Sequence, residues 1–72
     1  MTEVLNCKGM RCPQPVLKVG IKSNTMPRGS VLEVHADCST FPDDIRKWCQ
    51  NTGKVLVSCV DRAGVHVATI QF

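Results

Sequence analysis

The sequence is poor in aromatic residues and has no long apolar run. It contains one tryptophan, two phenylalanines and no tyrosine among 72 residues. No apolar stretch approaches the roughly 18 residues that a membrane-spanning helix needs, so the sequence predicts no membrane span. The first residues, Met1-Thr2-Glu3, lack the basic and apolar regions of a secretory signal peptide. We therefore expect a cytoplasmic protein.

The motifs of several common active sites are also missing. There is no Ser/His/Asp or Cys/His arrangement at usable spacing, no convincing carboxylate pair and no glycine-rich phosphate loop. The sequence has no C-x-x-C, and neither His35 nor His66 stands at ligand spacing from a cysteine, so we expect no metal and no other cofactor. A chain this short has room for one modest core, which predicts a single domain over residues 1–72.

What the chain does have is five cysteines, at positions 7, 12, 38, 49 and 59. An odd number without a signal peptide argues against a secreted disulfide scaffold and for reduced thiols. Cys49 and Cys59 fall in amphipathic segments and are predicted to fill the core. Cys7 ends a strand five residues before Cys12, where it either packs or acts as a second thiol, and packing is favoured. Cys38 falls in a loop and its role stays open.

Positive charge is concentrated at the start of the chain. Residues 1–29 contain five basic residues and one acidic residue, whereas residues 30–72 contain four basic and five acidic residues. This surplus is either an ordinary solvated helix face or a surface for an acidic partner. Direct nucleic-acid binding is not expected, because no aromatic residue accompanies the basic residues.

The apolar pattern predicts the order β-α-β-α-β-β. Strands are expected at residues 3–7, 30–37, 54–60 and 65–72, with a hairpin turn at 61–64. Prolines at 13 and 15 mark the start of a first helix that ends at Pro27-Arg28-Gly29. The spacing places Val16, Leu17, Gly20 and Ile21 on its apolar face.

A second helix is expected to start at Thr40, where T-x-x-D with Asp43 has the spacing of a capping box, and to end before Gly53. Ile45, Trp48 and Cys49 repeat at helical spacing along it. Together the elements predict an α+β, two-layer sandwich: a four-stranded mixed sheet with two helices on one face.

Cys12 is the residue most suited to chemistry. It stands at or beside the start of the first helix, whose unpaired N–H groups carry a partial positive charge. Arg11 and Lys8 add full positive charges, and all three effects favour a thiolate. Pro13 and Pro15 rigidify the helix start. Cys12 is either a reactive thiol that could also hold a persulfide or a small helix cap, and cysteine is not a favoured cap.

Two segments resemble one known family. Residues 9–15, G-M-R-C-P-Q-P, resemble the G-[L/M]-x-C-P-x-P signature of the TusA (SirA-like) sulfur-carrier family. Residues 44–53, D-I-R-K-W-C-Q-N-T-G, resemble its second-helix pattern, and the likeness covers nearly the whole chain.

The resemblance implies a sulfurtransferase in which Cys12 accepts a sulfane sulfur as a persulfide. A donor such as a cysteine desulfurase or a rhodanese would load it, and an acceptor protein would receive the sulfur for tRNA thiolation, cofactor assembly or sulfur metabolism. Such a protein would act as a carrier without a complete active site of its own. We expect the Cys12 site to be supported by Gly9, Arg11, Pro13 and Pro15. Partner proteins are expected to dock at Lys8, Lys18 and Lys22.

Three positions depart from the family pattern: Asn6 and Cys38-Ser39 stand where Asp and Asp-Pro are usual, and Gly20 stands where a basic residue is frequent. These departures leave the partners open. They also keep a second hypothesis in play, a thiol-redox or regulatory module that pairs Cys12 with Cys7 or Cys38. A third hypothesis is an RNA- or protein-binding domain whose cysteines are all structural.

Overall fold

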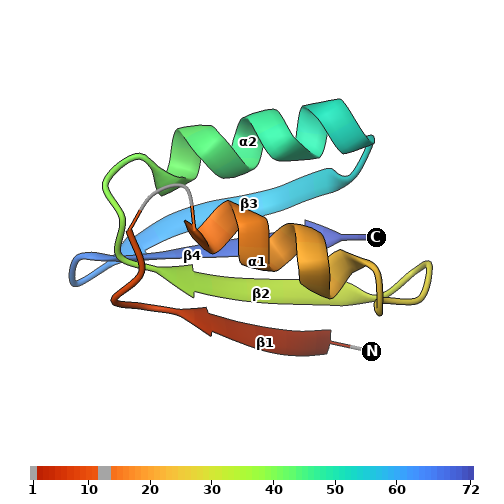
Figure 1. The fold of residues 1–72 in the computed structure, drawn as a ribbon, viewed down its shortest axis with the longest axis horizontal. Helices are drawn as coiled ribbons and strands as arrows, with labels where there is room; N and C mark the ends of the chain where they lie inside the picture. Colours follow the sequence, from red (N-terminus) through yellow and green to blue (C-terminus); the bar gives the residue numbers. More distant parts are fainter. Residues whose placement is uncertain (1, 12–13) are drawn as a thin grey trace.

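Four strands and two helices follow one another in the predicted order β-α-β-α-β-β (Figure 1). The structure is a computed structural model that describes residues 2–11 and 14–72. Its elements are β1 (Thr2–Cys7), α1 (Gln14–Ser23), β2 (Val31–Ala36), α2 (Phe41–Thr52), β3 (Val55–Arg62) and β4 (Val65–Gln71). The predicted α+β class is therefore confirmed.

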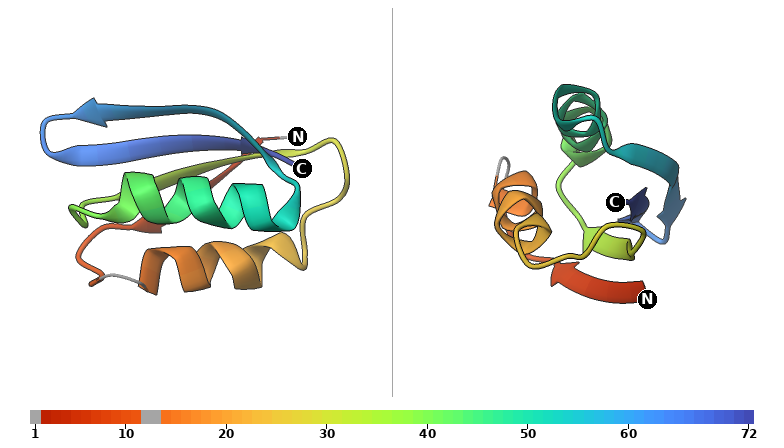
Figure 2. Two further views of the ribbon diagram at one scale, coloured as in Figure 1. Left: turned by 90° about the horizontal axis from the view of Figure 1, so that it is seen from above. Right: turned by 90° about the vertical axis from the view of Figure 1, so that its right-hand side faces the viewer.

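The strands form one mixed sheet in the order β1-β2-β4-β3. β1 pairs parallel with β2, while β4 pairs antiparallel with both β2 and β3. Parallel neighbours need a crossover connection, and α1 supplies it between β1 and β2. Both helices lie on the same face of the sheet (Figure 2). The predicted two-layer sandwich is confirmed.

The core lies between this sheet face and the helices. β2 alternates as predicted, with Leu32, Val34 and Ala36 fully buried and the residues between them half-exposed. Burial of this apolar surface against α1 and α2 is the main force that holds the layers together. The helices and the other strands contribute buried apolar side chains as well: Cys7, Val19, Phe41, Ile45, Cys49, Ala68 and Ile70.

The predicted apolar face of α1 is wrong in part. Pro15 and Val19 are its buried residues, whereas Leu17 and Ile21 are 60% and 65% exposed. Pro15 and Val19 are four residues apart, so they lie on one side of the helix and form the apolar stripe that meets the core. Val16 packs against the core as predicted, so the exposed part of the predicted face is Leu17 and Ile21.

Most strand boundaries shift by one residue, and two boundaries shift further. α1 ends at Ser23, before Pro27. At its last turn the hydroxyl of Ser23 donates to the carbonyl of Gly20, and the hydroxyl of Thr25 donates to the carbonyl of Lys22. β3 runs on to Arg62, so the hairpin turn tightens to two residues, both with positive φ.

The predicted capping box at the start of α2 does not form. Thr40 is the N-cap residue, but its side chain makes no capping hydrogen bond. Its hydroxyl donates to the carboxylate of Asp44 instead, at 3.0 Å. The other end of α2 follows the prediction, since Gly53 caps the helix in the left-handed conformation with φ 74°.

Candidate functional site at one end of the sheet

Three connections meet at one end of the sheet (Figure 1): the turn after β1, the loop after β2, and the β3–β4 hairpin. This convergence follows from topology, because parallel strands β1 and β2 both end there. The carboxyl ends of neighbouring parallel strands are a common place for functional sites.

The turn after β1 is held by backbone and side-chain hydrogen bonds. The N–H of Met10 donates to the carbonyl of Cys7 at 3.4 Å, and Gly9 has a φ of +81° that disfavours side chains with a Cβ. The N–H of Lys8 donates to Oδ1 of Asn6 at 3.0 Å. Asn6 thus supplies the acceptor oxygen that the Asp expected from the family pattern would supply, without its charge.

A second anchor ties this turn to the loop after β2. The N–H of Gly9 lies 3.0 Å from both carboxylate oxygens of Asp37. Gly9 was predicted to support the site, whereas Asp37 was not singled out. Only the register of two parallel strands, 28 residues apart at this point, reveals their contact.

Cys12 and Pro13 lie outside the described residues. On one side of them Arg11 is exposed, and its carbonyl accepts from the N–H of Gln14 at 2.8 Å. On the other side Pro15 is fully buried in the first turn of α1, which contains no acidic residue. The start of this helix is therefore anchored in the core and carries no negative side chain to offset its dipole.

The remaining cysteines differ in their surroundings. Cys7, Cys49 and Cys59 are free thiols. Burial raises the pKa of each thiol above its ordinary value, and Asp61 adds to this effect at Cys59. At neutral pH these three thiols stay protonated, so none of them has the activation that a nucleophilic cysteine needs. The predictions that Cys49 and Cys59 pack in the core agree with this environment.

Cys38 lies in the loop after β2, two residues before the N-cap of α2. It is half-buried and disulfide-bonded, and its Sγ lies 3.5 Å from the hydroxyl oxygen of Thr40. The N–H of Phe41 donates to the Cys38 carbonyl at 3.1 Å, which fixes the loop to the first turn of α2.

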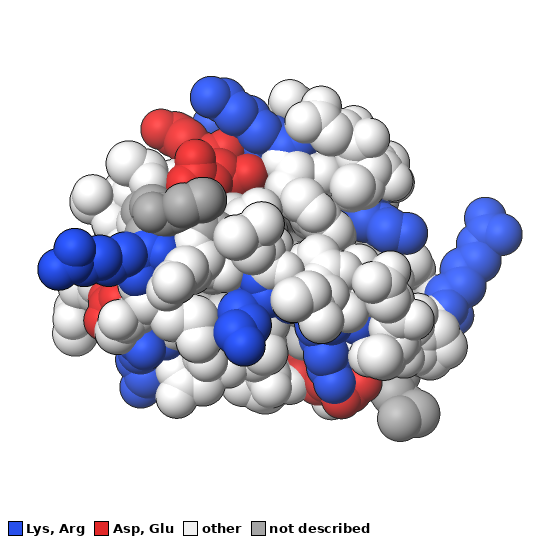
Figure 3. All heavy atoms as spheres, in the orientation of Figure 1, with Lys and Arg blue, Asp and Glu red and all other residues white. Residues whose placement is uncertain are grey.

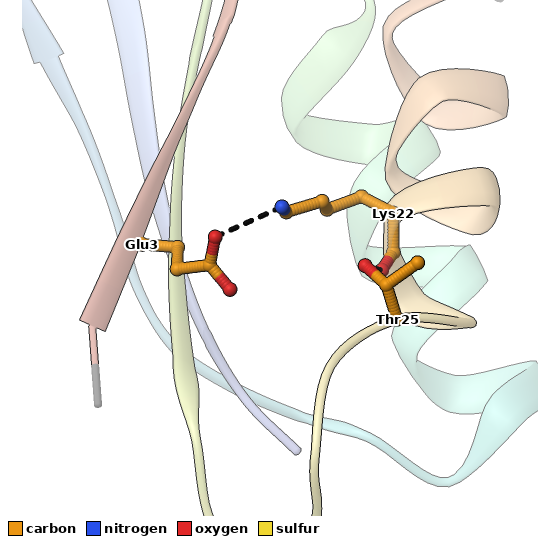
Figure 4. Close-up of polar contacts among 3 residues, drawn as sticks. All are labelled: Glu3, Lys22 and Thr25. Atoms are coloured by element: carbon orange, nitrogen blue, oxygen red, sulfur yellow. Dashed lines mark hydrogen bonds and ion pairs between the residues drawn. The ribbon is translucent and has the colours of Figure 1, made fainter.

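The three lysines predicted for docking are not equivalent. Lys22 forms an ion pair with Glu3 at 2.9 Å that links α1 to β1 (Figure 4). Lys8 and Lys18 are exposed, and no ion pair to a carboxylate is found for them among residues 2–11 and 14–72. Figure 3 shows basic side chains spread over the helix-bearing face of the molecule, with acidic side chains in fewer places.

Sequence reasoning missed an apolar surface beside these lysines. Leu17 and Ile21 project from α1, next to a shallow groove of about 270 Å³ between the two helices. The groove is lined by Val16 and Trp48 together with Asp44, Lys47 and Asn51 of α2. The sequence did contain a signal for this surface. α1 has apolar residues on more than one side, and the core can fully bury only one side of a helix.

Each of the two histidines contacts a carboxylate. His35 contacts Glu33 at 2.9 Å on the open face of the sheet, and His66 contacts Asp61 across the hairpin. Within the described part of the chain no group of three or more His, Cys, Asp or Glu could hold a metal ion. No helix in residues 2–11 or 14–72 is long and apolar enough to cross a membrane.

Comparison with known proteins gives one consistent result. The family model described as Sulfurtransferase TusA matches residues 3–72. A protein of Neisseria meningitidis named as a candidate sulfur carrier is 33% identical over 97% of this chain and 95% of its own length. Another from Bacillus subtilis is 30% identical over 96% of this chain and 92% of its own. The sulfur carrier protein TusA of Pseudomonas paraeruginosa is 31% identical over 94% of this chain and 86% of its own length.

Proposed function

Since this chain belongs to the TusA sulfurtransferase family and is a sulfur-relay carrier, we propose that Cys12 is the residue that carries the sulfur. The contrast among the cysteines supports this assignment. The three free thiols of the described residues are held protonated by burial. Cys12 instead falls in the sequence between exposed Arg11 and the positive end of α1.

In this proposal Cys12 acts as its thiolate. The thiolate attacks the outer sulfur of a donor persulfide, the S–S bond of the donor breaks, and the donor cysteine leaves as a thiolate. Cys12 then holds the sulfur as an anionic persulfide. Arg11, Lys8 and the α1 dipole stabilise the negative charge before and after transfer. The anchored Gly9 turn before Cys12 and the buried Pro15 after it support this assignment.

The carrier interacts with a sulfur donor and a sulfur acceptor, as its family implies. The donor is a cysteine desulfurase or a rhodanese, and the acceptor serves tRNA thiolation, cofactor assembly or sulfur metabolism. Exposed Lys8 and Lys18 attract an acidic partner surface, and Leu17 and Ile21 supply apolar contact next to them. A reducing cytoplasm suits this chemistry, because it keeps the thiols available.

The test is intact-protein mass spectrometry after full reduction and removal of the reductant. Wild type and Cys12→Ser are each incubated with a cysteine desulfurase and cysteine, with Cys59→Ser as a control that lacks a different thiol. A gain of one sulfur atom in wild type and Cys59→Ser, absent in Cys12→Ser and reversed by reductant, is the expected result. Equal loading of Cys12→Ser would overturn the assignment.

A further inference from the structure

β3 lies at one edge of the sheet and carries exposed apolar side chains. In the strand order β1-β2-β4-β3 its neighbour is β4, so its other side is an edge (Figure 1). The N–H and C=O groups on the outer side of an edge strand can pair with a further strand. Val55, Val57 and Val60 of β3 are 56%, 56% and 44% exposed. This edge therefore has both the backbone groups and the apolar surface for adding a strand from another chain.

A register shift within β3 changes which of its residues share a face. The shift lies between Leu56 and Ser58, so β3 has one extra residue there relative to β4. Leu56 lies opposite Ile70 of β4. Cys59 lies opposite Ala68, and both Ile70 and Ala68 are fully buried. Leu56 and Cys59 therefore lie on the helix-bearing face together, whereas residues three apart in a regular strand lie on opposite faces.

The same shift places Val55 and Val60 together on the open face of the sheet. Val55 precedes Leu56 and Val60 follows Cys59, and successive side chains of a strand point to opposite faces. Residues directly opposite each other in an antiparallel pair have side chains on the same face. Two copies of β3 can therefore pair with Val55 opposite Val60 of the second copy and Leu56 opposite its Cys59. The shift then falls at the two-fold axis, and the flanking segments pair regularly.

This register also brings opposite charges together at both ends of the pair. One position beyond Val55 and Val60, Lys54 lies opposite Asp61 of the second copy, and alternation puts both on the helix-bearing face. The Asp61 side chain is 69% exposed, so a second chain can reach its carboxylate. In a symmetric pair the contact between Lys54 and Asp61 occurs twice.

The other edge strand, β1, offers no such match. Within Thr2–Cys7 it carries one charged residue, Glu3, so two copies of β1 have no opposite charges to bring together. Glu3 is also paired with Lys22 of the same chain. Val4 is the one strongly exposed apolar residue of β1. Charge and apolar surface therefore both select β3.

We propose that β3 pairs antiparallel with β3 of a second copy of this chain, which joins the two sheets into one in a symmetric dimer. Exposed valines from both copies then cover one another on the open face, and their burial favours association. β1 is the opposite edge of the sheet, and α1 lies on that side of the molecule (Figure 2). The dimer therefore leaves Lys8, Lys18 and Leu17 accessible to a partner in each copy.

Two charge-reversed variants test this register. Lys54→Glu places a glutamate opposite Asp61, and Asp61→Lys places a lysine opposite Lys54, so each variant alone has like charges at both ends of the pair. In an equimolar mixture, a dimer with one chain of each variant again has opposite charges at both ends. Lys18→Glu is the matched control, since Lys18 lies on α1, away from β3. Sedimentation in reductant, from micromolar to millimolar protein, gives the mass without disulfide links between chains.

Wild type and Lys18→Glu are expected to shift reversibly from the 7.9 kDa monomer to twice that mass. Each charge-reversed variant alone should dimerise with a dissociation constant about tenfold higher, because two attractive pairs become repulsive. The mixture should recover the wild-type affinity. A wild type that stays monomeric at millimolar concentration would overturn the proposal. It would equally fail if the single variants dimerise as wild type does, or if mixing them restores nothing.

Discussion

The backbone N–H of Gly9 donates to the carboxylate of Asp37, with both oxygens at 3.0 Å. This contact joins the turn that leads toward Cys12 with the loop that carries Cys38. A charged acceptor makes a stronger hydrogen bond than a neutral one, so one side chain couples the two cysteine-bearing connections. The left-handed conformation of Gly9 is what turns its N–H toward Asp37.

Asp37→Ala should loosen this end of the sheet. The contact is exposed, so water replaces the lost acceptor and the free energy of unfolding should fall by about 0.5–1.5 kcal/mol. Sulfur loading should slow, because the turn before Cys12 loses its anchor. Urea unfolding and the loading assay measure the two effects. Asp37→Asn keeps one acceptor oxygen and should lie between Ala and wild type; an Ala variant that matches wild type in both assays would contradict the role.

Reversing the charge of a lysine should slow sulfur transfer by an amount that depends on whether that lysine already has an ion-pair partner. Lys8→Glu and Lys18→Glu should slow transfer from the donor, most strongly at low salt, because steering by exposed charges is screened by ions. Lys22→Glu should have a smaller effect on transfer, since Glu3 already offsets the Lys22 charge. Initial loading rates at two salt concentrations check this order. The docking assignment fails if all three variants load at the wild-type rate.

Gly20→Ala should stabilise the protein. A Cβ built at Gly20 would lie 3.7 Å from Nε1 of Trp48, an ordinary van der Waals distance, so the space between α1 and α2 accepts a methyl group. Alanine is favoured over glycine inside a helix by roughly 0.8–1 kcal/mol. Urea unfolding should show a gain of about that size.

Gly53→Ala is the matched control for that substitution. Gly53 caps α2 with a φ of +74°, where a Cβ is strained, so the same change should destabilise the protein by about 1 kcal/mol. Loss of stability in Gly20→Ala would mean that the two helices approach more closely than described.

Stability should fall at alkaline pH because of the buried thiols. Burial raises the Cys49 pKa above its ordinary value of 9.0, so the unfolded chain releases this proton at lower pH than the folded protein. The stabilisation is complete below the ordinary pKa and is lost as pH rises through the raised pKa. Cys7 and Cys59 add to the effect in the same direction.

Urea unfolding in reductant at about pH 7.5 and about pH 10 measures this dependence. Cys49→Ala should be less stable at both values, because a smaller side chain leaves space in the core, but its decline with pH should be shallower. Identical declines in the variant and wild type would show that Cys49 does not contribute through its ionisation.

The alternation of β2 and the C-terminal signal of α2 could be predicted from the sequence because they are local. Leu32, Val34 and Ala36 alternate with polar neighbours over one strand, and Gly53 follows a periodic helix directly. The motif around Cys12 was equally local, since its prolines and basic neighbours are adjacent residues. The element order and the family followed from such short patterns.

Tertiary structure decided what depends on the distance between segments. Which stripe of α1 meets the core is set by the sheet beneath it, so Leu17 and Ile21 looked buried in the sequence and are exposed in the fold. The contact of Gly9 with Asp37 exists because β1 and β2 run parallel in one register. The same register brings the loop after β2 beside the turn after β1, which no spacing along a single segment can specify.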